Sequence, residues 1–323
     1  MKRLGTLGAA LLLACASATA STDIRADAAG GGRFTAVAAG GDHNLALRDD
    51  GTVAAWGRDD HGQVSDAPEP DGFTAVAAGG LHSLALREDG TIAAWGNDRD
   101  GQVAEAPAGD GFVTVAAGFD HGLALREDGT IAAWGSDLAG QVGDAPETDG
   151  FVAVAAGGFH SLALREDGTI AAWGSDSGGQ VGETPTGTGF ERVSAGSFHG
   201  LALQGDGTIV AWGSDSDGQV SDAPDEPGFT AVAAGGFHSV ALTQDGTVVA
   251  WGSDSDAQVS GAPDEVGFTA VAAGAFHSVA LREDGAIVVW GSDDDGQVSD
   301  TPIAIDVPGI WDRSAWNEAT WGP

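Results

Sequence analysis

The sequence is poor in the residues that support disulfide bonds, thiol chemistry and phosphate binding. Cys15 is the only cysteine and Lys2 the only lysine among 323 residues, and tyrosine is absent. A chain with a single cysteine forms no internal disulfide. The sequence also contains no G-x-S-x-G elbow, no His-Glu zinc motif and no glycine-rich phosphate loop opening a helix. We therefore expect a protein without a cofactor and without catalytic activity.

Positive charge is scarce as well. The chain carries 48 acidic residues against 13 basic ones, for a formal net charge of −35. A polyanion repels phosphate backbones and anionic lipid headgroups, so binding to nucleic acid or to a membrane surface is disfavoured. Acidic, lysine-poor surfaces resemble those of proteins from salt-loving organisms. Their self-repulsion is relieved as the Debye length falls to roughly 3 Å near 1 M salt. The composition thus predicts a fold that loses stability in dilute buffer.

The first twenty residues, MKRLGTLGAALLLACASATA, combine a basic start, a short apolar stretch and small residues, which is typical of an export signal. Two processing routes fit. Cleavage at Ala18-Thr19-Ala20 releases a soluble protein that begins at Ser21. Alternatively, residues 12–15 (Leu-Leu-Ala-Cys) resemble a bacterial lipoprotein box, and Cys15 then carries the lipid. Both routes predict a bacterial protein in the periplasm, the medium or the lipid-anchored cell envelope, with membrane contact only through Cys15.

What the chain has in abundance is repetition. After a leader at residues 21–33, one unit of 39 residues recurs seven times over residues 34–307, and residues 308–323 form a tail. The units begin at equivalent phenylalanines: Phe34, Phe73, Phe112, Phe151, Phe190, Phe229 and Phe268. A fixed period of this length indicates one supersecondary unit that has been copied and stacked into a single domain.

Each unit is predicted to contain three good strands. In the first unit these are residues 34–39, 44–48 and 52–56, with a tight Asp-Gly turn between the second and third. Residues 63–65 offer a rudimentary fourth strand before Pro68 interrupts it. A meander buries one face only against a neighbouring copy, and seven copies close a ring. The sequence therefore predicts an all-β, seven-bladed β-propeller with the alanine-rich first strand innermost and the tryptophan of the third strand further out.

The repeated pattern V-A-A-G-x-x-H-x-L-A-L…D-G-T-I-x-A-W-G…G-Q-V resembles the repeat of the regulator of chromosome condensation family. In the second unit the matching positions are Gly79, His82, Leu84, Leu86, Gly90, Trp95, Gly96, Gly101 and Gln102. In its short units and its export signal, the sequence is similar to secreted bacterial members of the family. These include a propeller-type β-lactamase inhibitor protein with three-stranded blades. The resemblance implies a scaffold, and a propeller scaffold hosts many functions.

Functional information should lie where the copies differ. The residue before the repeated histidine is, in order, Asp42, Leu81, Asp120, Phe159, Phe198, Phe237 and Phe276. Each phenylalanine could plug its own loop, or the four could form a protein-binding platform, since clustered exposed aromatic residues build interface hot spots. The resemblance to the inhibitor implies that Leu81, Phe159, Phe198, Phe237 and Phe276 contact a partner.

The sequence evidence for metal-binding and acid–base sites is weaker. Asp215, Asp217, Asp293 and Asp295 lie in acidic loops that resemble calcium loops, but an EF-hand needs further ligands that these loops do not supply. A solvated turn is the favoured interpretation. The repeated histidines are about 10 Å apart in such a ring, which discourages zinc binding, so we expect each to hydrogen-bond a turn of its own blade. Asp120-His121 is the nearest approach to an acid–base pair, although adjacent strand residues point to opposite faces.

These observations predict an exported, monomeric, non-catalytic propeller that binds a protein partner of unknown identity through one loop face, as an enzyme inhibitor does. Two alternatives stay open: nucleotide exchange or regulation, which the family implies, and a propeller lyase or hydrolase whose site is not visible in the sequence. Trp311, Trp316 and Trp321 in the tail are spaced five apart, which matches one face of neither a helix nor a strand. Their role stays open.

Overall fold

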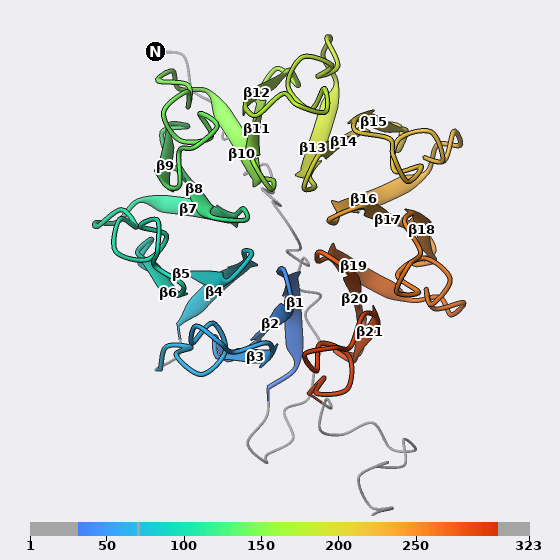
Figure 1. Ribbon diagram of the computed structural model, residues 1–323, viewed down its shortest axis with the longest axis horizontal. Helices are drawn as coiled ribbons and strands as arrows, with labels where there is room; N and C mark the ends of the chain where they lie inside the picture. The colour runs from blue at the N-terminus through green and yellow to red at the C-terminus, as the bar shows by residue number, and fades with distance from the viewer. Residues whose placement is uncertain (1–31, 70–71, 303–323) are drawn as a thin grey trace, which may run out of the picture.

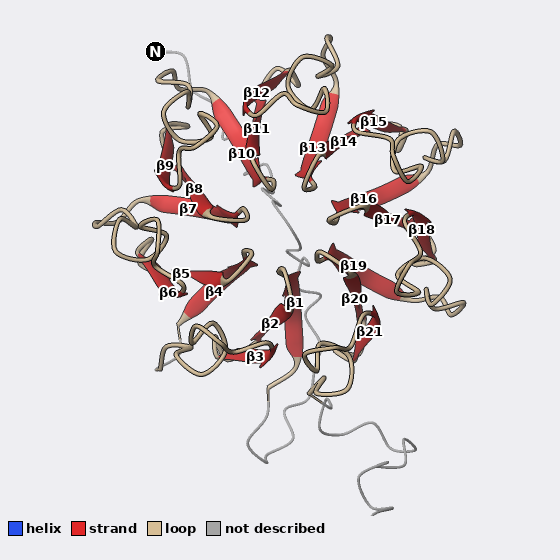
Figure 2. Cartoon of the chain, in the orientation of Figure 1, coloured by secondary structure: helices blue, strands red, loops and turns tan. Residues whose placement is uncertain are grey.

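Seven three-stranded antiparallel sheets surround a central axis in the computed structural model, which describes residues 32–69 and 72–302 (Figure 1). The described residues contain 21 strands and no helix (Figure 2), so none of them lies in a helix able to cross a membrane. The predicted seven-bladed β-propeller is thus confirmed. The predicted export signal, Cys15 and the three tail tryptophans lie outside the described residues.

The strands of every blade follow the chain from the axis outward. The innermost strands are β1 (Phe34–Ala39), β4 (Phe73–Ala78), β7 (Phe112–Ala117), β10 (Phe151–Ala156), β13 (Phe190–Ala195), β16 (Phe229–Ala234) and β19 (Phe268–Ala273). The middle strands are β2 (His43–Arg48), β5 (His82–Arg87), β8 (His121–Arg126), β11 (His160–Arg165), β14 (His199–Gln204), β17 (His238–Thr243) and β20 (His277–Arg282). The outer strands are β3 (Val53–Gly57), β6 (Ile92–Gly96), β9 (Ile131–Gly135), β12 (Ile170–Gly174), β15 (Ile209–Gly213), β18 (Val248–Gly252) and β21 (Ile287–Gly291).

The Asp-Gly turn joins the middle and outer strands as predicted. In the second blade, Gly90 has a φ of +78°, a conformation that glycine adopts without steric cost. The Asp89 carboxylate accepts hydrogen bonds from the backbone N–H of Thr91 at 2.9 Å and from its hydroxyl at 2.7 Å. This pair of bonds fixes the turn and sets the register in which Leu86 pairs with Ile92.

The rudimentary fourth strand predicted at residues 63–65 is wrong, because these residues form a turn. The Asp59 carboxylate accepts hydrogen bonds from the backbone N–H groups of Val64 and Ser65, both at 2.9 Å. The N–H of Asp66 then bonds the carbonyl of Gly62 at 3.0 Å. The backbone groups that a fourth strand needs for its ladder are therefore already used within the turn.

The core is divided into seven hydrophobic clusters, and each cluster spans two neighbouring blades. Between blades 3 and 4, Leu123 and Leu125 of β8 pack against Phe151, Val154 and Trp173 of the next blade. The last cluster joins blade 7 to blade 1 with equivalent residues. No blade has a core of its own, so each sheet depends on both neighbours for burial.

The repeated tryptophans lock neighbouring blades together. Each indole N–H donates to the backbone carbonyl of the glutamine in the preceding blade, as Trp173 does to Gln141 at 2.9 Å. Trp56 closes the circle by donating to Gln297 at 2.9 Å. The first and last blades are thus joined by the same bond as any other pair.

Five of the seven repeated histidines hydrogen-bond the next blade, and the other two, His82 and His160, have no partner, which corrects the prediction that each bonds a turn of its own blade. The Nε2 atom of His121 lies 3.0 Å from the Ser161 hydroxyl of the next blade, and the Ser161 hydroxyl donates to the Gln141 carbonyl at 3.2 Å. A serine has one hydroxyl hydrogen, so Nε2–H of His121 must be the donor. At the closure, Asn44 takes the place of serine and accepts from His277 at 2.7 Å.

Glycines bring the blades together at the axis. The N–H that follows the first loop glycine of each blade donates to a carbonyl of the next blade, from Gly41 to Gly79 at 2.9 Å and finally from Ala275 to Gly40 at 3.1 Å. A Cβ atom on Gly79 would lie 2.6 Å from the carbonyl oxygen of Gly118, closer than packed atoms come. Glycine is therefore required where these loops ring the axis.

Candidate functional site

Two loops of every blade emerge on the same end of the propeller, which we call the loop face. One loop precedes the repeated histidine and the other follows the Trp-Gly pair. A backbone hydrogen bond ties them together, as from Ser175 N to the Phe159 carbonyl at 2.9 Å. The residues that vary between copies at these two positions therefore share one surface.

Five phenylalanines form a continuous row on the loop face, across blades 3 to 7. They are Phe119, Phe159, Phe198, Phe237 and Phe276, and we call them the aromatic arc. The ring centroids of successive members are 5.8–6.3 Å apart, and the rings are stacked or tilted by no more than 35°. This spacing lies in the range for interacting aromatic pairs, and it is shorter than the 10 Å expected for equivalent residues of a ring. The structure brings the four predicted phenylalanines together.

The arc is open to solvent. Phe119 is 38% exposed, Phe159 36% and Phe276 38%, and the other two members are partly exposed. The rings contact one another across the blade boundaries, so they form a shared surface and are not separate plugs of single loops. Contiguous exposed aromatic residues of this kind mark interaction sites on soluble proteins.

Sequence reasoning missed two apolar residues of this surface, Phe119 and Leu138. Phe119 stands one position earlier in its loop than the other four phenylalanines, so a comparison of the position before histidine passes over it. It still stacks on Phe159 with an interplanar angle of 5°. Leu138, in the other loop of blade 3, is 90% exposed. A search of both loops for any large apolar residue would have found them.

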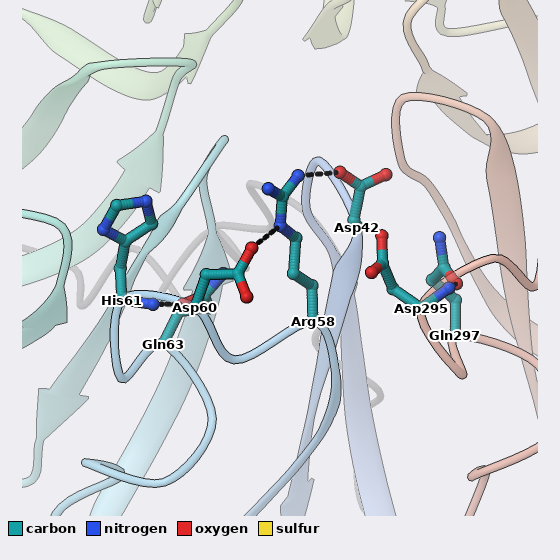
Figure 3. A network of polar contacts seen from close by, with 7 residues as sticks. All are labelled: Asp42, Arg58, Asp60, His61, Gln63, Asp295 and Gln297. Atoms are coloured by element: carbon teal, nitrogen blue, oxygen red, sulfur yellow. Dashed lines mark hydrogen bonds and ion pairs between the residues drawn. The ribbon is translucent and has the colours of Figure 1, made fainter.

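The arc stops at blades 1 and 2, which carry no phenylalanine in this loop. Leu81 occupies the loop position on blade 2 and is half-buried. On blade 1 the position belongs to Asp42, whose carboxylate lies 3.2 Å from the Arg58 guanidinium (Figure 3). Arg58 also contacts Asp60 at 2.7 Å. The loop face thus has an aromatic side and an ionic side.

The Asp120-His121 pair is not an acid–base dyad. The His121 ring is buried and bonded to Ser161, whereas the Asp120 carboxylate accepts a hydrogen bond from the Gln102 side chain at 3.1 Å. Burial lowers the pKa of His121 to about 3, with smaller contributions from neighbouring histidines. A neutral, enclosed imidazole of this kind is a structural group.

The acidic loops use their first aspartate as a turn cap. The Asp215 carboxylate accepts hydrogen bonds from Val220 N and Ser221 N at 2.9 Å, and these bonds lower its pKa below the usual value. Asp293 caps the equivalent turn of blade 7 in the same way. Asp217 and Asp295 each present a backbone N–H to a glutamine side chain at 2.8 Å. Within the described ranges, no three acidic, histidine or cysteine side chains are grouped to hold a metal.

A shallow funnel opens at the centre of the loop face, within the aromatic arc. Its wall consists of the small residues that ring the axis, including Gly79, Gly157 and Gly235, together with Phe119. Below it, the axis is lined mainly by alanines of the inner strands. The apolar side of the loop face therefore surrounds a hollow and not a protrusion.

The protein is therefore a propeller built of repeats, and one of its ends, the loop face, carries the aromatic arc. The model of the regulator of chromosome condensation (RCC1) repeat matches all seven units, at residues 34–63, 73–102, 112–141, 151–180, 190–219, 229–258 and 268–297. The chain belongs to the RCC1 repeat family. No curated relative matches it in sequence.

Several solved structures share the fold. The ectodomain of the Physcomitrella patens receptor kinase CR4 is 23% identical, with a TM-score of 0.68 over 81% of this chain and 74% of that one. The ectodomain of Arabidopsis thaliana ACR4 is 21% identical, with a TM-score of 0.67 over 80% and 98%. Prp20p from Saccharomyces cerevisiae, described with its binding to Gsp1p and histones, is 23% identical, with a TM-score of 0.65 over 81% and 84%.

Proposed function

We propose that this protein binds a protein partner through the aromatic arc and that it acts outside the cytoplasm. One observation carries the proposal: five consecutive blades each place a phenylalanine on one face, in a row of touching rings. A chain with a net charge of −35 otherwise presents a strongly polar surface to water. Burial of the row by a partner is favourable because each aromatic side chain removes a large apolar area from water.

The propeller suits this role because the arc rests on rigid sheets. The loop that carries Phe198 is held by bonds to its own blade and to the next one, through Ser214 N to Phe198 O at 2.9 Å and Ser197 N to Gly235 O at 3.1 Å. A pre-ordered surface loses little conformational entropy on binding. Prp20p shows that a propeller of this family can bind proteins.

Export is the second part of the proposal and rests on residues 1–20, with their basic start and small-residue end. Mass spectrometry of the native protein tests it. A mature chain that starts at Ser21, or one that starts at a lipidated Cys15, supports export. An intact N-terminus in the cytosolic fraction contradicts it.

The specific form of the proposal is inhibition of an exported enzyme such as a β-lactamase, in which the arc covers the active-site rim. The test measures binding and inhibition of purified exported β-lactamases by wild type and by a variant with Phe159, Phe198, Phe237 and Phe276 all changed to Ser. A matched control carries Val113→Ser and Val266→Ser, which remove exposed apolar side chains outside the arc.

Both variants should keep the wild-type far-ultraviolet spectrum, since the changed residues lie on the surface. Binding that is lost in the fourfold variant and kept in the control supports the proposal. Binding that is equal in all three proteins overturns the role of the arc. An absence of inhibition with retained, arc-dependent binding overturns the inhibitor form and leaves protein binding standing.

A further inference from the structure

Asp120 stands at the end of the aromatic arc, at the loop position where blades 4 to 7 carry phenylalanine. Its own blade carries two exposed apolar side chains, Phe119 in the same loop and Leu138 in the loop that the Ser136 N–H ties to the Asp120 carbonyl at 2.8 Å. Phe159 of the next blade stacks on Phe119. A carboxylate therefore lies at the end of the aromatic arc, in a blade whose two loops carry exposed apolar side chains.

This carboxylate is half-buried and carries one protein hydrogen bond from a side chain, from Gln102 at 3.1 Å. In the part of the chain that the structure describes, no cationic group lies within 4.0 Å of it. Burial raises the pKa of Asp120, the Gln102 bond opposes the rise, Asp100 adds like-charge repulsion and Arg99 offsets part of it from a distance. Charge that is partly removed from water without a counter-ion is unfavourable.

Asp42 is an aspartate at the equivalent position of another blade, and it has a counter-ion. It occupies the corresponding loop position on blade 1, and the Arg58 guanidinium neutralises it at 3.2 Å. The residue equivalent to Arg58 in blade 3 is Ser136, which has no charge to offer. Of these two aspartates on the loop face, one is therefore neutralised within the chain and the other is open to a cation from outside.

We propose that Asp120, Phe119 and Leu138 form a subsite that binds a lysine or arginine side chain of the protein partner. This inference rests on the proposed function and adds the chemistry of one contact. The cation pairs with the Asp120 carboxylate, and its aliphatic stem packs on Leu138 and Phe119. Lysine and arginine combine an apolar stem with a charged end, which matches a carboxylate set beside apolar side chains.

Other ligand groups match the subsite less well. An acidic group is repelled by Asp120 and by the net charge of the protein, and a purely apolar group would leave the carboxylate desolvated without a partner. A cation near the Phe119 ring also gains from the negative face of the aromatic system. The partner is therefore expected to present a basic residue flanked by apolar ones.

A random peptide library displayed on phage tests the subsite without knowledge of the natural partner. Selections run in parallel on wild type, on Asp120→Asn, on the matched control Asp42→Asn and on the fourfold phenylalanine variant. Asparagine keeps an acceptor for Gln102, so Asp120→Asn should fold, and its thermal unfolding is checked against wild type.

The wild type should select peptides with a lysine or arginine beside apolar residues. Their affinity should fall about tenfold or more for Asp120→Asn, by less than about twofold for Asp42→Asn, and beyond detection for the fourfold variant. Replacing the basic residue of a selected peptide by a neutral one should weaken its binding to the wild type by the same factor as Asp120→Asn weakens binding of the original peptide. The same replacement should hardly change the affinity of the peptide for the Asp120→Asn variant.

Peptides that need the aromatic arc but show no enrichment of basic residues, or that bind Asp120→Asn as tightly as wild type, overturn the subsite and leave the proposed function intact. A library that yields no peptide dependent on the arc contradicts the proposed function and the subsite together.

Discussion

His121 of blade 3 donates its Nε2–H to the hydroxyl of Ser161 in blade 4 at 3.0 Å, while its Nδ1 atom is buried without a partner. Equivalent bonds join His43 to Ser83, His199 to Ser239 and His238 to Ser278. The propeller therefore contains a belt of seven buried, neutral imidazoles, and five of them bond the next blade, whereas both ring nitrogens of His82 and His160 have no partner. Protonation of any of them places an unpaired charge in the core.

The histidine belt predicts acid unfolding. Burial lowers the pKa of these side chains from 6.5 to about 3 for His43, His121, His199 and His277, and to about 4 for His82, His160 and His238. Between pH 6.5 and 4 the unfolded chain binds more protons than the folded one, so the free energy of unfolding is highest above pH 6.5 and falls as the pH decreases.

Each histidine contributes a slope of about 1.4 kcal/mol per pH unit to the free energy of unfolding in this window. Over roughly one pH unit, the seven together approach the whole free energy of unfolding of a typical domain. Urea unfolding followed by tryptophan fluorescence at pH 8, 6 and 5, all at about 2 M salt, measures the effect. An unfolding midpoint that is unchanged between pH 8 and 5 contradicts the neutral belt.

A single serine should be measurable in the belt. Ser161→Ala leaves the His121 donor without an acceptor and removes one of the bonds to the Gln141 carbonyl, so we expect a loss of about 1–3 kcal/mol in the free energy of unfolding. Ser177→Ala is the matched control, because that hydroxyl is exposed, and it should cost under about 0.5 kcal/mol. If the two variants lose the same free energy of unfolding, the hydrogen bond between His121 and Ser161 does not stabilise the fold.

The acidic loop of blade 5 offers a test between a turn cap and a calcium ligand. Asp215→Ala should lower the Tm by roughly 2–4 °C, because Val220 and Ser221 lose their acceptor. Ser216→Ala, which removes only an exposed hydroxyl, should leave the Tm unchanged. The difference in Tm between the two variants should persist when a chelator of divalent cations is added. A wild-type Tm that rises on calcium addition, with no rise in Asp215→Ala, would assign a cation to the loop.

Salt should stabilise the protein. The chain carries a net charge of −35, and the repulsion among its carboxylates weakens as the Debye length falls from about 10 Å at 0.1 M to roughly 3 Å at 1 M salt. Calorimetry at pH 8 should show a Tm that rises steadily from 0.1 M to molar sodium chloride. A Tm that does not move over this range means that surface repulsion is negligible in the folded state.

The repeat made most of the fold predictable from the sequence. The period set the number of blades, and the β-branched and alanine-rich segments gave the strands to within a residue or two, as for the strand predicted at 44–48 and found at His43–Arg48. The fourth strand failed because the residues at 63–65 look extended in composition. Their hydrogen bonds to Asp59 depend on a turn that composition does not reveal. The aspartate three residues after the tryptophan recurs in every unit and was the available signal.

The candidate site was predictable in part. Comparison of one position across the copies found four members of the aromatic arc and missed Phe119, which reaches the same row from the neighbouring position in the loop. The partner of His121 was missed for a different reason. Whether an imidazole bonds its own blade or the next depends on how closely two sheets pack, which no single unit encodes. The contrast between Asp42 and Asp120 likewise appears only when Arg58 is placed in space.

Photo-crosslinking in an unfractionated extract of the source, at its native salt concentration, is the most direct test that the aromatic arc binds a protein partner. A benzoylphenylalanine replaces either Phe159 or Val113, which are each 36% exposed and lie at opposite ends of the blades. A discrete crosslinked partner is expected from position 159 and none from position 113. Crosslinks of equal yield from both positions, or none from position 159, would contradict the assignment of the aromatic arc as the binding surface.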